Sequence, residues 1–172
     1  MDNNITIGLF GTCGNSKWRE SFIKTYDKLN VNYFNPQVDD WKPELAQIEA
    51  EHLANDQIIL FPVTSETYGL GSLGEVGFSI LQAIKLDSNR DIVVMIDDLV
   101  EIDETQMTSN ELTNHLQLAK ESIKMRALVK QHLKKLNYPC IYLVDSLVNM
   151  MAVSMRLYEI QIKKQELKQF TI

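Results

Sequence analysis

Residues 57–71 read Gln-Ile-Ile-Leu-Phe-Pro-Val-Thr-Ser-Glu-Thr-Tyr-Gly-Leu-Gly. The first seven residues form a short apolar run, which is typical of a strand that is buried on both faces. Proline cannot donate to a sheet ladder, so we expect Pro62 at the carboxyl end of this strand, where pairing stops. Residues 64–74 are rich in Gly, Ser and Thr, which predicts a loop, and a helix is expected from there to about Leu86. The stretch therefore predicts a strand that leads through a glycine-rich loop into a helix.

The same alternation of strand and helix patterns extends along the chain. Further strands are expected over residues 5–11, 31–34, 91–96 and 141–144. Further helices are expected from an Asn15 or Ser16 cap to about Leu29, and over residues 43–55, 112–137 and 146–169. Connections of this length favour parallel strand pairs. We therefore expect an α/β fold with a single domain over residues 1–172. Its five-stranded, mainly parallel sheet should carry helices on both faces, as in flavodoxin or Rossmann folds, with residues 109–172 forming the long carboxyl-terminal helices and last strand.

Composition excludes several classes of protein. The chain has 172 residues, of which 45% are hydrophobic, and a formal net charge of −6. This charge argues against a nucleic-acid partner, and no apolar run approaches the roughly 18 residues of a membrane span. The start of the chain is acidic and polar, so we expect no signal peptide. Cys13 and Cys140 are too few for a disulfide scaffold. We expect a cytoplasmic protein without a membrane partner, and we find no spacing typical of metal ligands.

Two carboxyl-terminal helices have distinctive patterns. Basic residues recur over residues 120–135, which predicts a solvated helix face, with phosphate or RNA binding as the alternative. The opposite, buried face is expected to hold Leu112, Leu116, Ala119, Ile123 and Ala127. The last helix is apolar around much of its circumference, through Leu147, Met150, Met151, Met155, Leu157 and Ile160. Either this helix lies deep in the monomer, or it forms a subunit interface; we predict a homo-oligomer through it.

The seven glycines gather at two places, each near the end of a predicted strand and the start of a predicted helix. They are Gly8, Gly11 and Gly14, then Gly69, Gly71, Gly74 and Gly77. Glycine permits tight turns and close backbone approach to a ligand, and a helix start offers free N–H groups. Neither group has the spacing of a dinucleotide-binding motif or a phosphate-loop ATPase. We predict a ligand site between residues 11–16 and residues 69–75, with ordinary turn chemistry as the alternative.

Several side chains near these glycines are candidates for chemistry. Glu75 is expected at a helix start, where the dipole favours a carboxylate, and it is either a nucleophile or a structural complement to that dipole. Asp39 and Asp40 are candidates to protonate a leaving base or to bind a sugar, or else they are turn residues. Trp41 is placed to stack on a base or to pack over the next helix. Cys13 has no histidine nearby in sequence, which makes a Cys–His nucleophile the weaker hypothesis.

Four pieces of the sequence together resemble a known family. They are Gly-Thr-Cys-Gly-Asn-Ser-Lys-Trp-Arg over residues 11–19, Tyr-Phe-Asn-Pro over residues 33–36, Trp41, and Gly-Leu-Gly-Ser-Leu-Gly-Glu-Val-Gly over residues 69–77. The chain is similar in these pieces to the nucleoside 2-deoxyribosyltransferase-like family, which is related to 2′-deoxynucleoside 5′-phosphate N-glycosidases. The resemblance covers roughly the first 86 residues. It implies a five-stranded parallel sheet and an active site that needs no cofactor.

The resemblance also implies roles for individual residues. Glu75 matches the glutamate that attacks the anomeric carbon of the sugar, and Glu49 lies near the family's second acidic residue. Gly69 stands where the family has an aspartate that helps to hold the sugar, and Glu66 and Ser72 are the candidates to replace it. We expect catalytic roles for Glu75, Glu49 and Asp40. The residues expected to bind substrate are Gly11, Thr12, Asn15, Trp18, Asn35, Pro36, Trp41, Ser65, Gly71 and Ser72.

Three functions are consistent with these features. The first is cleavage or exchange of the N-glycosidic bond of a nucleoside or nucleotide through a glycosyl–enzyme intermediate. The second is hydrolysis of a nucleotide, whose 5′-phosphate would lie against residues 11–16, or against Ser65 and Ser72. The third is a non-catalytic module that binds a nucleotide in the same pocket. The partner in each case is a small nucleoside or nucleotide.

Overall fold

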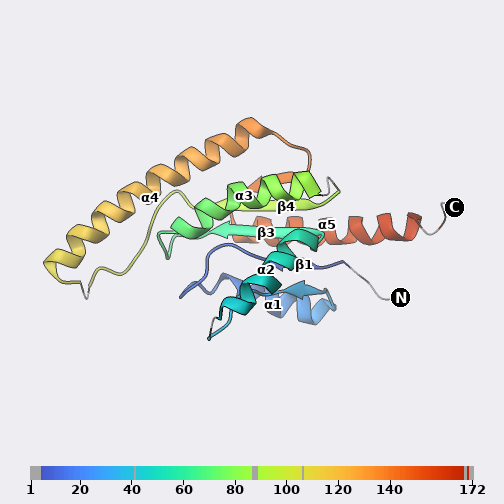
Figure 1. Cartoon of the computed structure of the whole chain (residues 1–172), viewed down its shortest axis with the longest axis horizontal. Helices are drawn as coiled ribbons and strands as arrows, with labels where there is room; N and C mark the ends of the chain where they lie inside the picture. Colours follow the sequence, from blue (N-terminus) through green and yellow to red (C-terminus); the bar gives the residue numbers. More distant parts are fainter. Residues whose placement is uncertain (1–4, 41, 87–88, 106, 169, 171–172) are drawn as a thin grey trace.

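The computed structural model of the protein describes residues 5–40, 42–86, 89–105, 107–168 and 170. Within them the strands are β1 (Ile7–Leu9), β2 (Tyr33–Phe34), β3 (Ile58–Val63), β4 (Asp91–Ile96) and β5 (Ile141–Val144). The helices are α1 (Trp18–Leu29), α2 (Pro43–Asn55), α3 (Leu70–Leu86), α4 (Ser109–Leu136) and α5 (Leu147–Lys168). The strands form one parallel sheet in the order β2-β1-β3-β4-β5 (Figure 1). The predicted α/β fold with a five-stranded parallel sheet is confirmed.

Apolar side chains alternate between the two faces of the sheet, and helices cover both faces. Ile58 and Leu60 of β3 belong to a core cluster that also contains side chains of α1 and α5. Ile59, Phe61 and Val63 belong to the opposite cluster, which contains side chains of α3 and α4. Every residue of β3 and β4 is buried. This burial explains why both strands are continuous apolar runs in the sequence.

The strand order reverses between β1 and β3, and this reversal brings the loops that follow the two strands together. The backbone N–H of Thr12 donates to the carbonyl oxygen of Pro62 at 2.9 Å. The hydroxyl Oγ1 of Thr12 donates to the same oxygen at 3.2 Å and accepts from the N–H of Thr64 at 3.0 Å. In open parallel sheets, ligands bind outside the carboxyl ends of the strands at such a reversal. The topology therefore places the expected site beside these two loops.

Pro62 lies one residue before the end of β3 and is in register with Met95 of β4. Pairing between β1 and β3 has already ended at Leu60. Gly11 approaches the backbone nitrogen and carbonyl oxygen of Pro62 from the β1 side, so the missing N–H costs no ladder hydrogen bond there. The prediction that pairing stops at Pro62 is confirmed for β1 and is wrong for β4.

The long helix α4 buries a different face from the predicted one. Its buried residues are His115, Ser122, Arg126 and Leu133. Leu116 and Ile123, which we expected inside, are 55% and 37% exposed, and Ala127 is exposed as well. The amino-terminal half of α4 projects past the carboxyl end of β3 (Figure 1). Around Ser122 and Arg126 the inner face of α4 contacts loop backbone, whose carbonyl groups need hydrogen-bond donors more than apolar packing. Arg126 is therefore an exception to the predicted solvated basic face.

Most of the apolar side chains that we singled out in α5 pack in the core of the single chain. Met150 and Leu157 are buried, and Leu147, Met151 and Met155 pack against the same cluster as α1. Ile160 remains 46% exposed. The homo-oligomer expected through this helix stays a prediction. None of the described helices is long and apolar enough to cross a lipid bilayer.

Candidate functional site

A cavity of about 580 Å³, here called the edge cavity, opens beside the carboxyl ends of β1 and β3. It is lined by Gly11, Cys13, Gly14, Asn15, Pro36, Gln37, Val38, Asp39, Glu49, Gly71, Ser72 and Glu75. The two glycine-rich segments that we expected to share a site thus line one cavity. The loop after β2 and one side chain of α2 complete its wall.

The first loop of the cavity requires glycine at its turn. Gly11 has a φ of +92°, in the left-handed region that side chains rarely adopt. A Cβ at this position would lie 2.4 Å from the carbonyl oxygen of Pro62, so no other residue fits without moving β3. The helix α1 then begins with Lys17 as its N-cap and has no side-chain capping bond. Neither Asn15 nor Ser16 is the cap that the sequence predicted.

Arg19, on the first turn of α1, stabilises the first loop through hydrogen bonds to its carbonyl groups. Its side chain is 3% exposed and donates to the carbonyl oxygens of Leu9 at 2.9 Å and Thr12 at 2.6 Å. It also donates to Oε1 of Gln37 at 3.2 Å, and Gln37 in turn donates to the carbonyl oxygen of Gly14 at 3.1 Å. Arg19 therefore joins the first loop to the loop after β2. Burial lowers the pKa of Arg19, although Cys13 and Glu49 act in the opposite direction.

Arg126 of α4 holds the second loop in the same manner. Its side chain is fully buried, and Nη1 donates to the carbonyl oxygens of Val63 and Asp97, both at 3.1 Å. Nη2 donates to the carbonyl oxygens of Thr64 at 2.9 Å and Thr67 at 2.8 Å. One guanidinium thus satisfies four carbonyl groups at the ends of β3 and β4. The carbonyl oxygen of Val63 also accepts from the N–H of Asp97 at 2.9 Å, so Arg126 adds a second donor there.

Arg126 also limits the space for a side chain at Gly69, the residue just before α3. Gly69 has a φ of +62°, and a Cβ there would lie 2.6 Å from Cγ1 of Val63 and 3.1 Å from Nη2 of Arg126. The hydroxyl of Ser122 accepts from Nε of Arg126 at 3.0 Å and donates to the carbonyl oxygen of Tyr68 at 2.5 Å. The network fixes the backbone immediately before α3 begins.

The helix α3 begins at Leu70, whereas the sequence predicted that the preceding loop would extend to residue 74. Glu75 therefore lies in the second turn of α3 instead of at its start. Gly71 is one turn before Glu75, on the same helix face. A Cβ at Gly71 would have no neighbour within 4 Å, so this glycine leaves open space on the cavity side of the carboxyl group. The prediction that the helix start stabilises the Glu75 carboxylate is wrong, because the dipole effect fades beyond the first turn.

The carboxyl groups of Glu75 and Glu49 both have raised pKa values. Partial burial raises the pKa of Glu75, and the negative charge of Glu49 raises it further. Burial also raises the pKa of Glu49, while the positive charge of Arg19 lowers it in part. With Asp39, the cavity lining has three carboxyl groups and no lysine or arginine among the described residues. No group of three or more described His, Cys, Asp or Glu side chains is arranged to hold a metal ion.

The structure separates the predicted binding residues into two groups. Gly11, Asn15, Pro36, Gly71 and Ser72 line the edge cavity. Thr12, Trp18, Asn35 and Ser65 do not. Trp18 is 3% exposed, stacks on Arg19 and donates from Nε1 to the carbonyl oxygen of Thr12 at 2.9 Å, so it belongs to the core. Thr12 is buried between the two loops.

The remaining predicted residues lie in other surroundings. Asn35 lines an adjoining hollow, and the hydroxyl of Ser65 donates to Glu101 at 3.2 Å. Asp40 points to solvent with an 83% exposed side chain, 3.4 Å from Nζ of Lys42. Its neighbour Asp39 lines the cavity instead. Trp41 lies outside the described residues.

Glu66, a candidate to replace the family's aspartate, does not line the edge cavity. Its Oε1 accepts from the hydroxyl of Ser16 at 3.0 Å, and that hydroxyl is also 3.1 Å from Oγ1 of Thr64. Burial alone would raise the pKa of Glu66. Hydrogen bonds from Thr64, its own backbone and Ser16, together with the charge of Arg126, lower it overall. Glu66 therefore connects the two loops, and Ser72 is the candidate that reaches the cavity.

Arg19, Gln37 and Arg126 are not among the site residues predicted from the sequence. The signal for Arg19 is its place beside Trp18 in the apolar pattern of α1, where a solvated side chain is not expected. Arg126 recurs with other basic residues, and a basic run usually lies in solvent. Its role becomes visible only when the loop carbonyls of β3 and β4 are seen to meet α4.

The chain also matches the model of a known protein family. The model of the family described as "Nucleoside 2-deoxyribosyltransferase like" matches residues 4–99, more than half of the chain. This range contains β1 to β4 and every residue that lines the edge cavity. Comparisons with curated proteins and with solved structures gave no match. The chain belongs to the nucleoside 2-deoxyribosyltransferase-like family.

Proposed function

We propose that the protein is an enzyme that breaks the N-glycosidic bond of a nucleoside and transfers the sugar to a second base or to water. The observation that supports this most is the pair of carboxyl groups, Glu75 on α3 and Glu49 on α2, that line one cavity. Glycosidic cleavage uses two such groups, one to capture the sugar and one to carry the proton of the leaving group. Membership of the family supports the same chemistry.

In the first step a carboxylate oxygen of Glu75 attacks the anomeric carbon. An ester bond forms, the N-glycosidic bond breaks, and its electron pair leaves with the base. Glu49, as the acid, gives its proton to the departing nitrogen. In the second step a nitrogen of an incoming base, or water, gives its proton to Glu49 and attacks the same carbon, which releases Glu75. The raised pKa of Glu49 suits a group that must hold a proton before the first step and regain one in the second.

The charge of the cavity favours an unphosphorylated substrate. Asp39, Glu49 and Glu75 line it, and no described lysine or arginine does. A 5′-phosphate placed among these groups would be repelled. An adjoining hollow of about 490 Å³ contains Lys17 and shares Asp39 with the edge cavity. It is the place where a phosphate would find a cation, so the substrate test must include nucleotides.

The test is release of free base from a panel of nucleosides and their 5′-monophosphates, measured by chromatography. Exchange with an isotopically labelled free base separates transfer from hydrolysis. We expect wild-type activity on at least one unphosphorylated nucleoside, and loss of activity in Glu75→Gln. Glu44→Gln is the matched control, because Glu44 is an exposed acid on the first turn of α2. Binding of nucleosides without any turnover would support a non-catalytic binding module instead.

A further inference from the structure

The helix that carries Glu49 has few attachments to the rest of the molecule. None of the 13 residues of α2, all of which the structure describes, is buried. Its N-cap residue, Lys42, makes no capping bond through its side chain. Helices in proteins are held mainly by packing of an apolar face, and α2 buries little of one. Besides the packing of α2 against α3, the position of Glu49 therefore depends on the contacts made near the carboxyl end of α2.

Those contacts centre on His52 and Asp56. Nδ1 of His52 lies 2.9 Å from Oδ1 of Asp56, the residue that ends the helix. The imidazole ring also stacks on the ring of Phe34 in β2, with 3.6 Å between ring centroids and an interplanar angle of 3°. Asp56 is 4% exposed, whereas His52 is partly exposed. We call these three side chains the α2 clamp.

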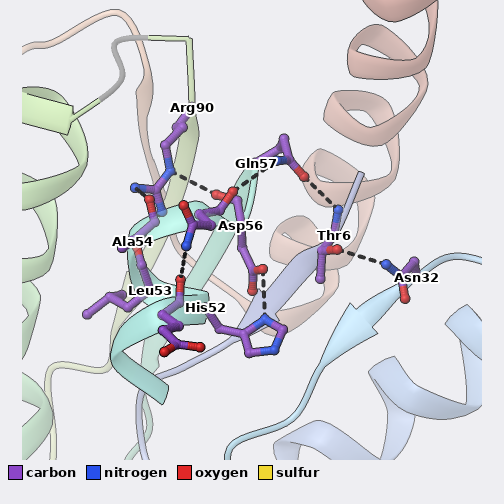
Figure 2. Close-up of polar contacts among 10 residues, drawn as sticks. Thr6, Asn32, His52, Leu53, Ala54, Asp56, Gln57 and Arg90 are labelled. Atoms are coloured by element: carbon purple, nitrogen blue, oxygen red, sulfur yellow. Dashed lines mark hydrogen bonds and ion pairs between the residues drawn. The ribbon is translucent and has the colours of Figure 1, made fainter. Parts of the chain in front are cut away.

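The clamp is seated against the sheet. A Cβ at Gly8 of β1 would lie 2.7 Å from Oδ2 of Asp56, so this glycine makes room for the carboxyl group. Arg90, just before β4, donates from Nε to the carbonyl oxygen of Asp56 at 2.8 Å and from Nη1 to that of Ala54 at 2.9 Å (Figure 2). Its Nη2 donates to the carbonyl oxygen of Leu53. The end of α2 thereby lies against β1 and is hydrogen-bonded to the residue that precedes β4.

The clamp also joins two walls of the edge cavity. His52 is three residues after Glu49 and lies near it on the helix surface. Phe34 directly precedes the loop whose residues 36–39 line the cavity. The stacked pair therefore ties the helix that supplies Glu49 to the strand that supplies the facing loop.

We propose that the α2 clamp positions Glu49 at the edge cavity, so that His52 and Asp56 are positioning residues for the reaction. The inference rests on the proposed function for the role that it gives to Glu49. None of the three clamp residues lines the cavity. His52 and Asp56 act through the placement of α2.

The cost of burying Asp56 supports a positioning role. Its Oδ2 is buried and has no hydrogen-bond partner among the described residues. Burial raises the pKa of Asp56, although the hydrogen bond and charge of His52 and the charge of Arg90 lower it in part. A polar pair with one buried partner adds little stability compared with apolar packing, but its directed hydrogen bond restricts the geometry. The directed contact to His52 supplies such a geometry at the end of α2.

The experiment measures the pKa of the Glu75 carboxyl group by NMR titration of ¹³C-labelled glutamate side chains in the full chain. Glu75→Gln identifies the resonance. The charged groups that face this site are Glu49 and Asp39, with Arg19 behind Glu49. Because the charge of Glu49 raises the pKa of Glu75, that pKa reports how close Glu49 is. The readout needs no turnover, so it is independent of the proposed reaction.

We expect Glu49→Gln to lower the pKa of Glu75, and His52→Ala to lower it in the same direction. In the double variant with Glu49→Gln and His52→Ala, the pKa of Glu75 should be no lower than in Glu49→Gln alone, because both changes act through the charge of Glu49. His52→Asn keeps an N–H near the position of Nδ1 and should restore part of the wild-type value. Gln47→Ala, which removes an exposed contact to Glu51 on the same helix, should leave the pKa unchanged. If His52→Ala does not fold, the pKa of Glu75 is compared between the wild type and Asp56→Asn instead.

Two results would overturn the proposal. One is a folded His52→Ala or Asp56→Asn variant with the wild-type pKa at Glu75. The other is an additive lowering in the double variant, which would mean that His52 acts on Glu75 without Glu49. If the wild type releases base, kcat should fall about tenfold or more in His52→Ala with KM nearly unchanged. If the wild type releases no base, the proposed function fails, and the titration still decides the role of the clamp.

Discussion

Replacement of Arg126 by methionine should destabilise the protein strongly while keeping most of the side-chain volume. The guanidinium donates to the carbonyl oxygens of Val63, Asp97, Thr64 and Thr67. At about 1 kcal/mol for each hydrogen bond removed, the loss is about 4 kcal/mol. The substitution also removes the cost of burying the charged guanidinium, whose pKa is lowered by burial, and this offsets part of the loss. We therefore expect a net loss of about 2–4 kcal/mol in the free energy of unfolding.

Urea titration followed by circular dichroism measures this loss. Lys130→Met is the matched control on the same helix, because Nζ of Lys130 forms a 2.6 Å ion pair with the 76% exposed side chain of Asp98. Such a pair contributes at most about 1 kcal/mol. A loss below about 1 kcal/mol in Arg126→Met, or equal losses in the two variants, would refute the role given to Arg126 in holding the second loop.

Three further predictions follow from other parts of the structure. Gly69→Ala should lose about 1–3 kcal/mol in the same titration, because its φ is +62° and its Cβ would meet Val63, whereas Gly74→Ala faces open space and should gain about 0.5–1 kcal/mol. Glu49→Gln should raise the free energy of unfolding near pH 7 and have little effect near pH 3. A raised native pKa gives stability that is present below the unfolded-state pKa and is lost as pH rises through the native one. Light scattering should find a particle larger than the 19.8 kDa chain, since Ile160 of α5 is 46% exposed; a monomer would contradict the predicted oligomer.

Strands and most helices could be predicted from local sequence pattern. The bounds predicted for α2, β4 and β5 agree with the structure, because a proline start, apolar runs and polar boundaries mark them. The start of α3 could not be predicted in this way. Gly71 and Gly74 resemble loop residues, yet they lie in the first turns of the helix, where Gly71 keeps space open beside Glu75.

The site was predicted better where it depends on topology than where it depends on side-chain direction. Two glycine-rich segments after neighbouring parallel strands do line one cavity. Trp18 and Asp40 could not be placed from sequence, because an aromatic residue beside a loop can face the core, and adjacent aspartates differ in which one faces the cavity. The face of α4 was misjudged for a related reason. Ser122 and Arg126 face inward because they donate hydrogen bonds to loop carbonyl groups. The sequence of α4 alone does not indicate where those carbonyl groups lie.

The role of Glu75 as nucleophile is tested most directly by trapping the glycosyl–enzyme ester. Wild-type protein is mixed with a nucleoside that it cleaves, quenched in acid within one turnover, digested and analysed by mass spectrometry. We expect the peptide that contains Glu75 to gain the mass of the sugar residue, and Glu75→Gln to give no such adduct. Rapid base release with the sugar attached to another residue, or with no adduct at any quench time, would contradict the role of Glu75.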